Sequence, residues 1–246
     1  ELQLTPLMKQ VRIVQWLATL RSKAHLRRQV KDPALRKKLV PDYPIGAKRV
    51  LFNDDYYPTL GRANVRLVTD AVERIEPDAV RSKGGEPIAA DVIIYATGFH
   101  ATDFLAPMSV TGAGGRDLKQ EWQHGAHAYL GVTVSGFPNL FMLYGPNTNL
   151  GHNSILVMIE AQVGYVIDAI RRMDAGGVRR LDVKRPVMEE YNRWLQGELA
   201  RSVWAADKQS WYKLADGTIT NNWPHSTIRY RRLLRHADLG AYDTAT

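Results

Sequence analysis

Two adjacent cations, Lys48 and Arg49, lie in a segment whose composition is suited to holding side chains in place. Residues 41–57 read PDYPIGAKRVLFNDDYY, and this mixture of prolines, a glycine and aromatic residues predicts an irregular, positioned loop. A guanidinium stays charged at every relevant pH and can stabilise an oxyanion, whereas an ammonium on a flexible stem suits a phosphate. The pair therefore indicates a site for two different anions, and the alternative is two exposed surface charges.

A second candidate site is the polar loop NTNLGHN at residues 147–153. It lies between a predicted strand at 139–144 and a predicted amphipathic helix from about Ser154 to Met173. Ligands gather beyond the carboxyl ends of the strands in an open α/β sheet, and the free amides at the start of a helix favour an anion. An anion at this place could be a phosphate or the N1/O2 edge of a reduced flavin, and the equally weighted alternative is an ordinary loop with an Asn/Ser helix cap. His152 could donate to a cofactor or serve as a cap or surface residue.

A third place to search is the end of the apolar segment DVIIYATGF. Residues 91–97 lack the alternation of a half-exposed strand, which predicts a strand covered on both faces. Gly98 follows directly and allows the backbone to approach a ligand closely. We therefore expect a ligand-facing turn after Thr97.

Other patterns argue against other kinds of site. The glycine cluster GAGGRD carries Asp117 where a dinucleotide-binding loop has its last glycine, and this predicts a surface turn. His124 and His127 are spaced as metal ligands could be, but no third ligand is clearly placed, so we expect no metal. The Trp211–Tyr212 pair is by itself typical of core packing. No nucleophile elbow, Walker loop or hydrolase carboxylate pair is present in the sequence.

Composition excludes several classes of protein. The absence of cysteine removes disulfides, thiolate metal sites and cysteine nucleophiles. No stretch approaches the length of a membrane span and no signal-peptide pattern begins the chain, so we expect a soluble, cytoplasmic protein without membrane association. The net charge of +8 suggests an anionic partner, but no nucleic-acid-binding motif accompanies it, so we expect no nucleic acid. The first residue is glutamate, which suggests that translation does not start there.

The order of elements indicates an α/β protein. Helical periodicity runs through residues 4–40, with a restart at Asp32-Pro33, a cap followed by proline. Short β-type runs follow at 65–69 and 72–75, with a turn at the glycine pair 84–85. A further helix is predicted over residues 186–204. This alternation of strands and helices is typical of the α/β class.

Three motifs together resemble the class B flavoprotein monooxygenases, and more closely Baeyer-Villiger enzymes of the hydroxyacetophenone-monooxygenase type. These are IGAKRVLFNDDYYPTL, DVIIYATGF and FPNLFMLYGPNTNLGHNS, and the resemblance extends to SWY and to the WPHSTIRYRR stretch. It implies an incomplete flavoprotein with two Rossmann-like dinucleotide-binding domains, for FAD and NAD(P). Residues 1–44 would be a helical insertion, 45–97 the returning part of the NADPH-binding domain, and 98–246 the closing part of the FAD-binding domain.

The resemblance also implies roles for particular residues. Arg49 matches the active-site arginine that stabilises the negatively charged flavin peroxide and its adduct with a ketone. Lys48 matches the lysine that helps select the 2'-phosphate of NADPH, and Trp211 a tryptophan near the nicotinamide ribose. Thr97 and Gly98 match the crossing between the two nucleotide domains. The residues that match the passage of the chain beside the flavin ring are Asn149, Gly151, His152, Asn153 and Ile155.

The implied reaction converts a ketone and dioxygen into an ester or lactone, with FAD and NADPH as cofactors. Two alternatives remain: oxygenation of amine or sulfide heteroatoms, and a noncatalytic subunit that docks on a separate nucleotide-binding chain. Both glycine-rich loops and the central fingerprint of the family belong to its amino-terminal half, and none occurs in this sequence. We therefore expect the chain to need that half, or a complementary chain, for activity.

Overall fold

A computed structural model describes residues 4–207 and 210–246, and contacts between Cα atoms divide the chain into two compact units. The first unit contains residues up to 16, 43–50 and 100–246, and the second contains 17–42 and 51–99. The elements are α1 (Leu4–Met8), α2 (Arg12–Gln29), α3 (Pro33–Leu39), α4 (Tyr56–Leu60), β1 (Val72–Ile75), β2 (Ala79–Ser82), β3 (Pro87–Ala89), η1 (Ala113–Gly115), α5 (Leu118–Glu121), α6 (Ile155–Ala175), β4 (Arg180–Val183), α7 (Arg185–Leu199), α8 (Val203–Ala206), α9 (Thr227–Leu233), η2 (Leu239–Ala241) and β5 (Tyr242–Ala245).

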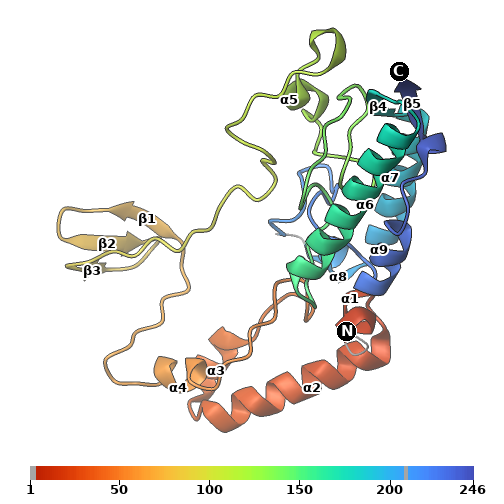
Figure 1. The fold of residues 1–246 in the computed structure, drawn as a ribbon. Coiled ribbons are helices and arrows are strands. Elements are labelled where there is room, and N and C mark those ends of the chain that lie inside the picture. The colour runs from red at the N-terminus through yellow and green to blue at the C-terminus, as the bar shows by residue number, and fades with distance from the viewer. Residues whose placement is uncertain (1–3, 208–209) are drawn as a thin grey trace. The chain divides into compact units, whose positions relative to one another are not determined.

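Helix α6 is the main support of the first unit, and it forms where the sequence predicts a helix (Figure 1). The hydroxyl of Ser154 caps its start by accepting a hydrogen bond from Leu156 N at 3.3 Å, and Gly176 ends it with an N–H bond to the carbonyl of Arg172. Its buried face packs against α9 and carries Met158, Gln162, Tyr165 and Ala169. One helical face therefore supplies both packing and a buried polar group.

The short antiparallel pair β4–β5 closes one end of the first unit, with Val183 opposite Tyr242 (Figure 1). The Tyr242 hydroxyl lies 2.6 Å from that of Tyr165 and 3.3 Å from Thr133 Oγ1. All four side chains are buried. Buried hydroxyls must be hydrogen-bonded, so this cluster specifies how β5 seats against α6.

The second unit combines the rest of α2 with α3, α4 and a three-stranded antiparallel sheet in the order β1-β2-β3. Asp32 caps α3 by accepting hydrogen bonds from Ala34 N and Leu35 N, which confirms the predicted restart. The predicted strand at 72–75 and the turn at the 84–85 glycines are also confirmed. The predicted helix over 186–204 ends earlier, at Leu199, and α8 begins at Val203.

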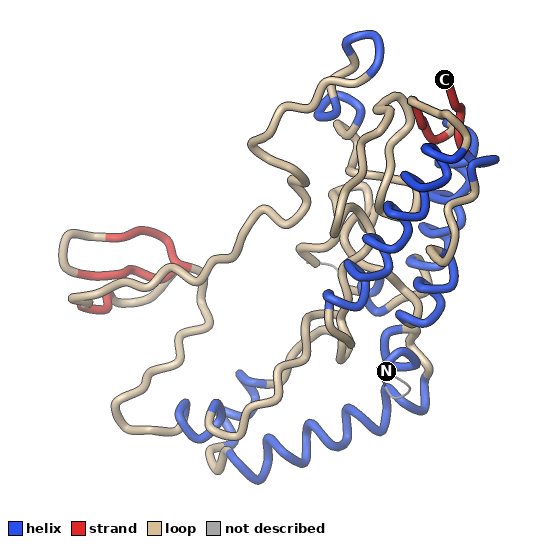
Figure 2. Tube along the Cα trace, viewed as in Figure 1, coloured by secondary structure: helices blue, strands red, loops and turns tan. Residues whose placement is uncertain are grey.

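The predictions of strands at 65–69, 91–97 and 139–144 are wrong for this structure. A strand covered on both faces takes its hydrogen bonds from neighbouring strands, and no described residue pairs with 91–97. That segment follows β3 as a stretch without helix or strand (Figure 2), with Ile94 86% exposed. Residues 139–144 are instead interrupted by positive φ values at Asn139 (58°) and Tyr144 (59°), which a regular strand does not allow.

The partial α/β architecture is nevertheless the expected one. The polar loop at 147–153 and the helix α6 form as predicted. The segment predicted to be an irregular loop, 41–57, contains no helix or strand until α4 begins at Tyr56. In the part of the chain that the structure describes, no helix is both long and apolar enough to cross a membrane. The three-part domain division remains a prediction.

Candidate functional site

The loop that carries the two cations is held to the rest of the first unit through its backbone. Gln15 Nε2 donates to the carbonyl of Ile45 at 3.0 Å, and Ala47 is fully buried. Gly46 has φ +91°, and a Cβ at this position would lie 2.9 Å from Met8 Cε. Only glycine satisfies both the positive φ and the close approach. The loop therefore leads the chain into Lys48 along a defined path.

Lys48 lies among aromatic rings. Its ammonium is 4.3 Å from the ring centroid of Tyr43 and 5.8 Å from that of Trp211, within the range of a cation–π interaction. Trp211 is 54% exposed and makes an edge contact with Tyr212, so the interpretation of this pair as core packing is wrong for Trp211. The structure thus brings together two residues that lie far apart in the sequence, Lys48 and Trp211.

Arg49 is exposed and makes no ion pair or hydrogen bond with a described residue. Burial and the nearby Tyr212 raise the pKa of the Tyr144 hydroxyl, and the positive charge of Arg49 partly offsets that rise. Arg49 is therefore close enough to Tyr144 to interact with it electrostatically. The Tyr144 hydroxyl donates to Asn149 Oδ1 at 2.9 Å. The guanidinium therefore lies near the start of the polar loop, with its charge uncompensated by any described carboxylate.

The polar loop is held against the segment 219–223 by backbone and amide hydrogen bonds. Asn149 N donates to the carbonyl of Asn221 at 2.8 Å, and Trp223 N donates to the carbonyl of Asn149 at 2.8 Å. The Asn149 side chain donates to Asn222 Oδ1 at 2.8 Å, and Asn147 Nδ2 donates to the carbonyl of Ile219 at 2.7 Å. The Asn149 amide is thus engaged within the protein, which suits a role in positioning the loop.

The end of the polar loop leads into α6, whose first residue is Ile155. Asn153 Nδ2 donates to Thr227 Oγ1 at 3.3 Å, while its Oδ1 accepts from Ser154 N at 2.8 Å. A Cβ on Gly151 would lie 3.3 Å from the sulfur of Met8, so this glycine allows close packing. His152 is half-buried beside it. These residues form a continuous, well-anchored turn into the helix.

Thr97 and Gly98 belong to the second unit and are exposed, as is the whole of 91–100. Gly98 adopts φ +85°, so the chain turns there as expected from its glycine. The cations and the polar loop belong to the first unit. The assignment of Thr97 and Gly98 therefore rests on the sequence motif.

One residue that sequence reasoning missed is Gln162, which is fully buried on α6. Its Oε1 accepts from Tyr144 N at 2.8 Å, and its Nε2 donates to the hydroxyl of Tyr230 at 2.9 Å and to the carbonyl of Gly131 at 3.4 Å. It thereby fixes the strained backbone at Tyr144 just before the polar loop. The signal that could have found it is a glutamine in register with the buried positions of an amphipathic helix.

His225 is a second buried polar residue that the sequence did not single out. Its Nε2 lies 3.1 Å from a carboxylate oxygen of Glu198, its ring stacks on Trp194 with centroids 5.6 Å apart, and Arg229 Nη1 lies 3.2 Å from its Nδ1. Burial, together with the charges of Lys9 and Arg229, lowers the pKa of His225 to about 4, although Glu198 opposes the shift. The imidazole is therefore neutral in the folded protein at pH 7.

Acidification is expected to destabilise the first unit through this histidine. Between pH 6.5 and 4 the unfolded chain binds a proton at His225 that the folded chain excludes, so the free energy of unfolding falls as the pH falls, by about 2–3 kcal/mol at roughly pH 4.5. Urea unfolding at several pH values measures this slope. His225→Asn should flatten the slope over this window, and an unchanged slope in that variant would exclude His225 as its source.

The donor set suits an anion. Lys48 and Arg49 are adjacent cations without a described carboxylate partner, and Arg49 lies near Tyr144. Lys48 held on aromatic rings suits a phosphate, whereas Arg49 near the turn suits a developing oxyanion. Described residues contain no group of three or more His, Cys, Asp or Glu side chains that could hold a metal ion. His127 instead lies 3.5 Å from Glu121 and contacts the carbonyl of Gly125.

No family model matches the chain, but curated proteins and solved structures similar to it were found. It is 44% identical over 90% of its length to a Baeyer-Villiger monooxygenase of Pseudomonas aeruginosa, and 39% identical over 90% to one of Streptomyces coelicolor. It also matches a structure of OTEMO in complex with FAD and NADP (TM-score 0.86, 26% identity, 98% of the chain), and an oxidised steroid monooxygenase bound to NADP (TM-score 0.81, 30% identity, 94% of the chain).

The matches cover less than half of each relative. The chain spans 42% and 43% of the two curated proteins, and 46% and 44% of the two crystallised chains. By sequence and by structure, the chain corresponds to the carboxyl-terminal part of the Baeyer-Villiger monooxygenases.

Proposed function

We propose that this chain is part of an FAD- and NADPH-dependent monooxygenase that converts ketones into esters or lactones. The observation that carries the proposal is the adjacent pair of cations, Lys48 over the Tyr43 ring and Arg49 near Tyr144, without a described carboxylate to neutralise them. FAD, reduced by NADPH, would supply the oxygen-activating chemistry. Dioxygen and a small ketone would be the substrates.

Within this function Arg49 is the catalytic residue. A fixed guanidinium stabilises negative charge that develops on oxygen, and it costs no reorganisation if it is already in place. Lys48 would bind a phosphate of NADPH, with Tyr43 and Trp211 limiting the conformations of its ammonium. In this proposal Arg49 acts in the reaction and its neighbour Lys48 binds the cofactor.

The polar loop would orient the flavin. Its backbone is anchored through Asn149 and Asn153 rather than left to move, so Gly151, His152 and the amides at Ile155 are presented in fixed positions. Thr97 and Gly98 would form the crossing between the nucleotide-binding domains. These roles follow from the sequence motif together with the anchoring contacts.

Two alternatives use the same residues differently. Oxygenation of an amine or sulfide heteroatom needs the flavin but not a guanidinium to stabilise a carbonyl adduct, so the exposed Arg49 favours the ketone reaction. A noncatalytic subunit would dock through the apolar segment 92–95, whose Val92 is 77% and Tyr95 71% exposed. That segment is equally the contact expected with a nucleotide-binding half, so it does not favour a noncatalytic role.

Complementation is expected to restore flavin binding. The 246-residue chain alone should lose added FAD on desalting, because it contains neither glycine-rich phosphate loop. Coexpression with the amino-terminal portion of the Pseudomonas relative, the part beyond the matched region, should yield a yellow complex that oxidises NADPH in a ketone-dependent manner. Absorbance after desalting and ester analysis by gas chromatography provide the readouts.

The matched control is the same amino-terminal portion purified alone. If that portion forms ester without the chain, or if a well-folded complex binds FAD and yet forms none, the proposed function is wrong. Tight retention of FAD by the chain alone would instead contradict the need for a second half.

A further inference from the structure

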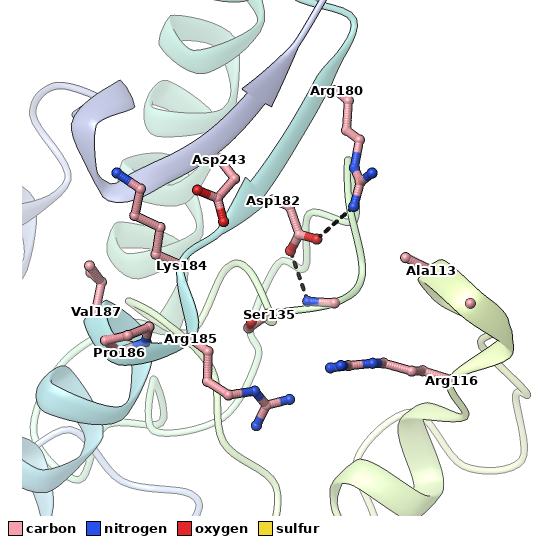
Figure 3. Close-up of a pocket in the computed structure, with 12 residues that line it drawn as sticks. Ala113, Arg116, Ser135, Arg180, Asp182, Lys184, Arg185, Pro186, Val187 and Asp243 are labelled. Carbon is pink, nitrogen blue, oxygen red and sulfur yellow. Dashed lines mark hydrogen bonds and ion pairs between the residues drawn. The ribbon is translucent and has the colours of Figure 1, made fainter.

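A cavity of about 720 Å³ lies in the first unit, lined by residues that the proposed function does not use (Figure 3). Its walls are the turn at 113–116, the loop at 135–136, strand β4 and the first turn of α7, with β5 at one edge. None of the residues assigned to the flavin, NADPH or ketone lines it. The cavity is of the size that small-molecule sites usually have.

Positive charge predominates in this cavity. Four cations line it, Arg116, Arg180, Lys184 and Arg185, against the two carboxylates Asp182 and Asp243. Figure 3 shows the Arg116 and Arg185 side chains extending toward one another across the opening. The lining therefore favours an anion.

Most of these charges are held in place by partners. Asp182 accepts from Gly136 N at 2.8 Å and from Arg180 Nη2 at 3.3 Å. Arg185 forms a two-pronged pair with Glu121, at 3.0 and 3.2 Å, and this pair holds the pKa of Glu121 below its usual range. Asp182 is therefore engaged by donors and does not present a bare carboxylate to a ligand.

Arg116 is the cation that remains available. Its guanidinium makes no ion pair or hydrogen bond with any residue that the structure describes, so it is available to bind a ligand. Gly136, with φ +87°, lies against it: a Cβ there would come within 2.8 Å of Arg116 Nη1. The glycine is required for this position of the guanidinium, because any other residue would displace it.

The start of α7 contributes amides. This 15-residue helix begins after Lys184, whose side chain does not cap it, and Pro186 occupies its first turn. The uncapped end of a helix carries partial positive charge and free N–H groups. At the same place Ser135, which is only 7% exposed, lines the cavity, and its hydroxyl has no hydrogen-bond partner among the described residues. A hydroxyl that lines a cavity and makes no bond within the protein is available to donate to a ligand there.

We propose that this cavity binds the phosphate group of a small molecule, with Arg116, the Ser135 hydroxyl and the first amides of α7 as its donors. The glycine turn beside it appeared unsuited to phosphate in the sequence because of Asp117. In the structure Asp117 is turned away as the cap of α5, where its carboxylate accepts from Lys119 N at 2.7 Å and Gln120 N at 3.1 Å. That carboxylate does not line the cavity, so the objection does not apply.

The test is calorimetric titration of the 246-residue chain with inorganic phosphate, and with AMP and adenosine to separate the phosphate from the group that carries it. We expect saturable binding of phosphate and AMP but not of adenosine. Arg116→Gln should weaken binding at least about tenfold, since a charge-assisted hydrogen bond is lost. Arg116 is exposed, so this variant should fold.

Arg171→Gln is the matched control, because it removes the same charge from an exposed position on α6 outside the cavity. Its affinity should equal that of the parent chain. Ser135→Ala, a smaller change, should weaken phosphate binding by about threefold or more. Absence of saturable phosphate binding, or equal loss in the Arg116 and Arg171 variants, overturns the proposal. The assay contains no flavin or ketone, so its failure leaves the proposed oxygenase function untouched.

Discussion

Replacing Arg49 with alanine is expected to lower ester formation at least about 100-fold in the complemented enzyme, while flavin reduction by NADPH changes less than about threefold. The guanidinium is exposed and has no described carboxylate partner, so its removal should cost little stability and take away only the charge that we propose stabilises the reacting oxygen. Single-turnover absorbance measures the reduction step, and product analysis measures ester formation.

Two further variants show that the effect belongs to this one charge. Lys48→Gln removes the neighbouring cation and should raise the KM for NADPH more than it lowers the rate of oxygenation, because the lysine is proposed to bind a phosphate. Arg49→Lys keeps the charge but loses the planar fork, and should recover only part of the activity. A normal ester yield in the Arg49→Ala variant would contradict the catalytic role of Arg49.

Replacing Gln162 with leucine is expected to lower the free energy of unfolding by about 3–5 kcal/mol, because several buried groups lose their partner at once. The amide of Tyr144, the hydroxyl of Tyr230 and the carbonyl of Gly131 all bond to this side chain. Leucine fills a similar volume, so the effect measures lost hydrogen bonds more than a cavity. Urea unfolding followed by tryptophan fluorescence provides the measurement.

Gln120→Leu on α5 makes the same chemical change at an exposed side chain and should shift stability by less than about 0.5 kcal/mol. If the two variants unfold at the same urea concentration, Gln162 does not hold the turn at Tyr144. A Gln162 variant that remains folded should also lose flavin from the complemented enzyme, because the polar loop begins at that turn.

The helices were predictable because their signals are local. Ser154 before α6, Gly176 after it and the Asp32-Pro33 pair before α3 each act within one helical turn. The apolar run at 91–97 gives an equally clear pattern, but a strand also needs neighbours that need not be close in the sequence. No described residue supplies them, so the pattern predicts a strand that the structure leaves extended.

The same distinction applies to the site. Lys48 and Arg49 were predicted from residue type and loop composition, and the resemblance added Trp211 to them. Gln162 and the segment 219–223 were not predicted, because their role depends on contacts such as the bond from Asn147 to Ile219, 72 positions away. Chemistry-bearing residues can be recognised in a sequence, whereas the residues that hold them in place are found only when the chain is folded.

The extended segment 91–97 has a consequence for handling the protein. It presents an apolar stretch, with unpaired backbone donors and acceptors, and Val92, Ile94 and Tyr95 are each more than two-thirds exposed. Such a stretch, free of proline, is a template for β-pairing between copies of a chain and thus for aggregation. The lysine and acidic residues around it are too few to prevent this. The chain should therefore stay in solution to a greater extent when it is produced together with a partner that covers this segment.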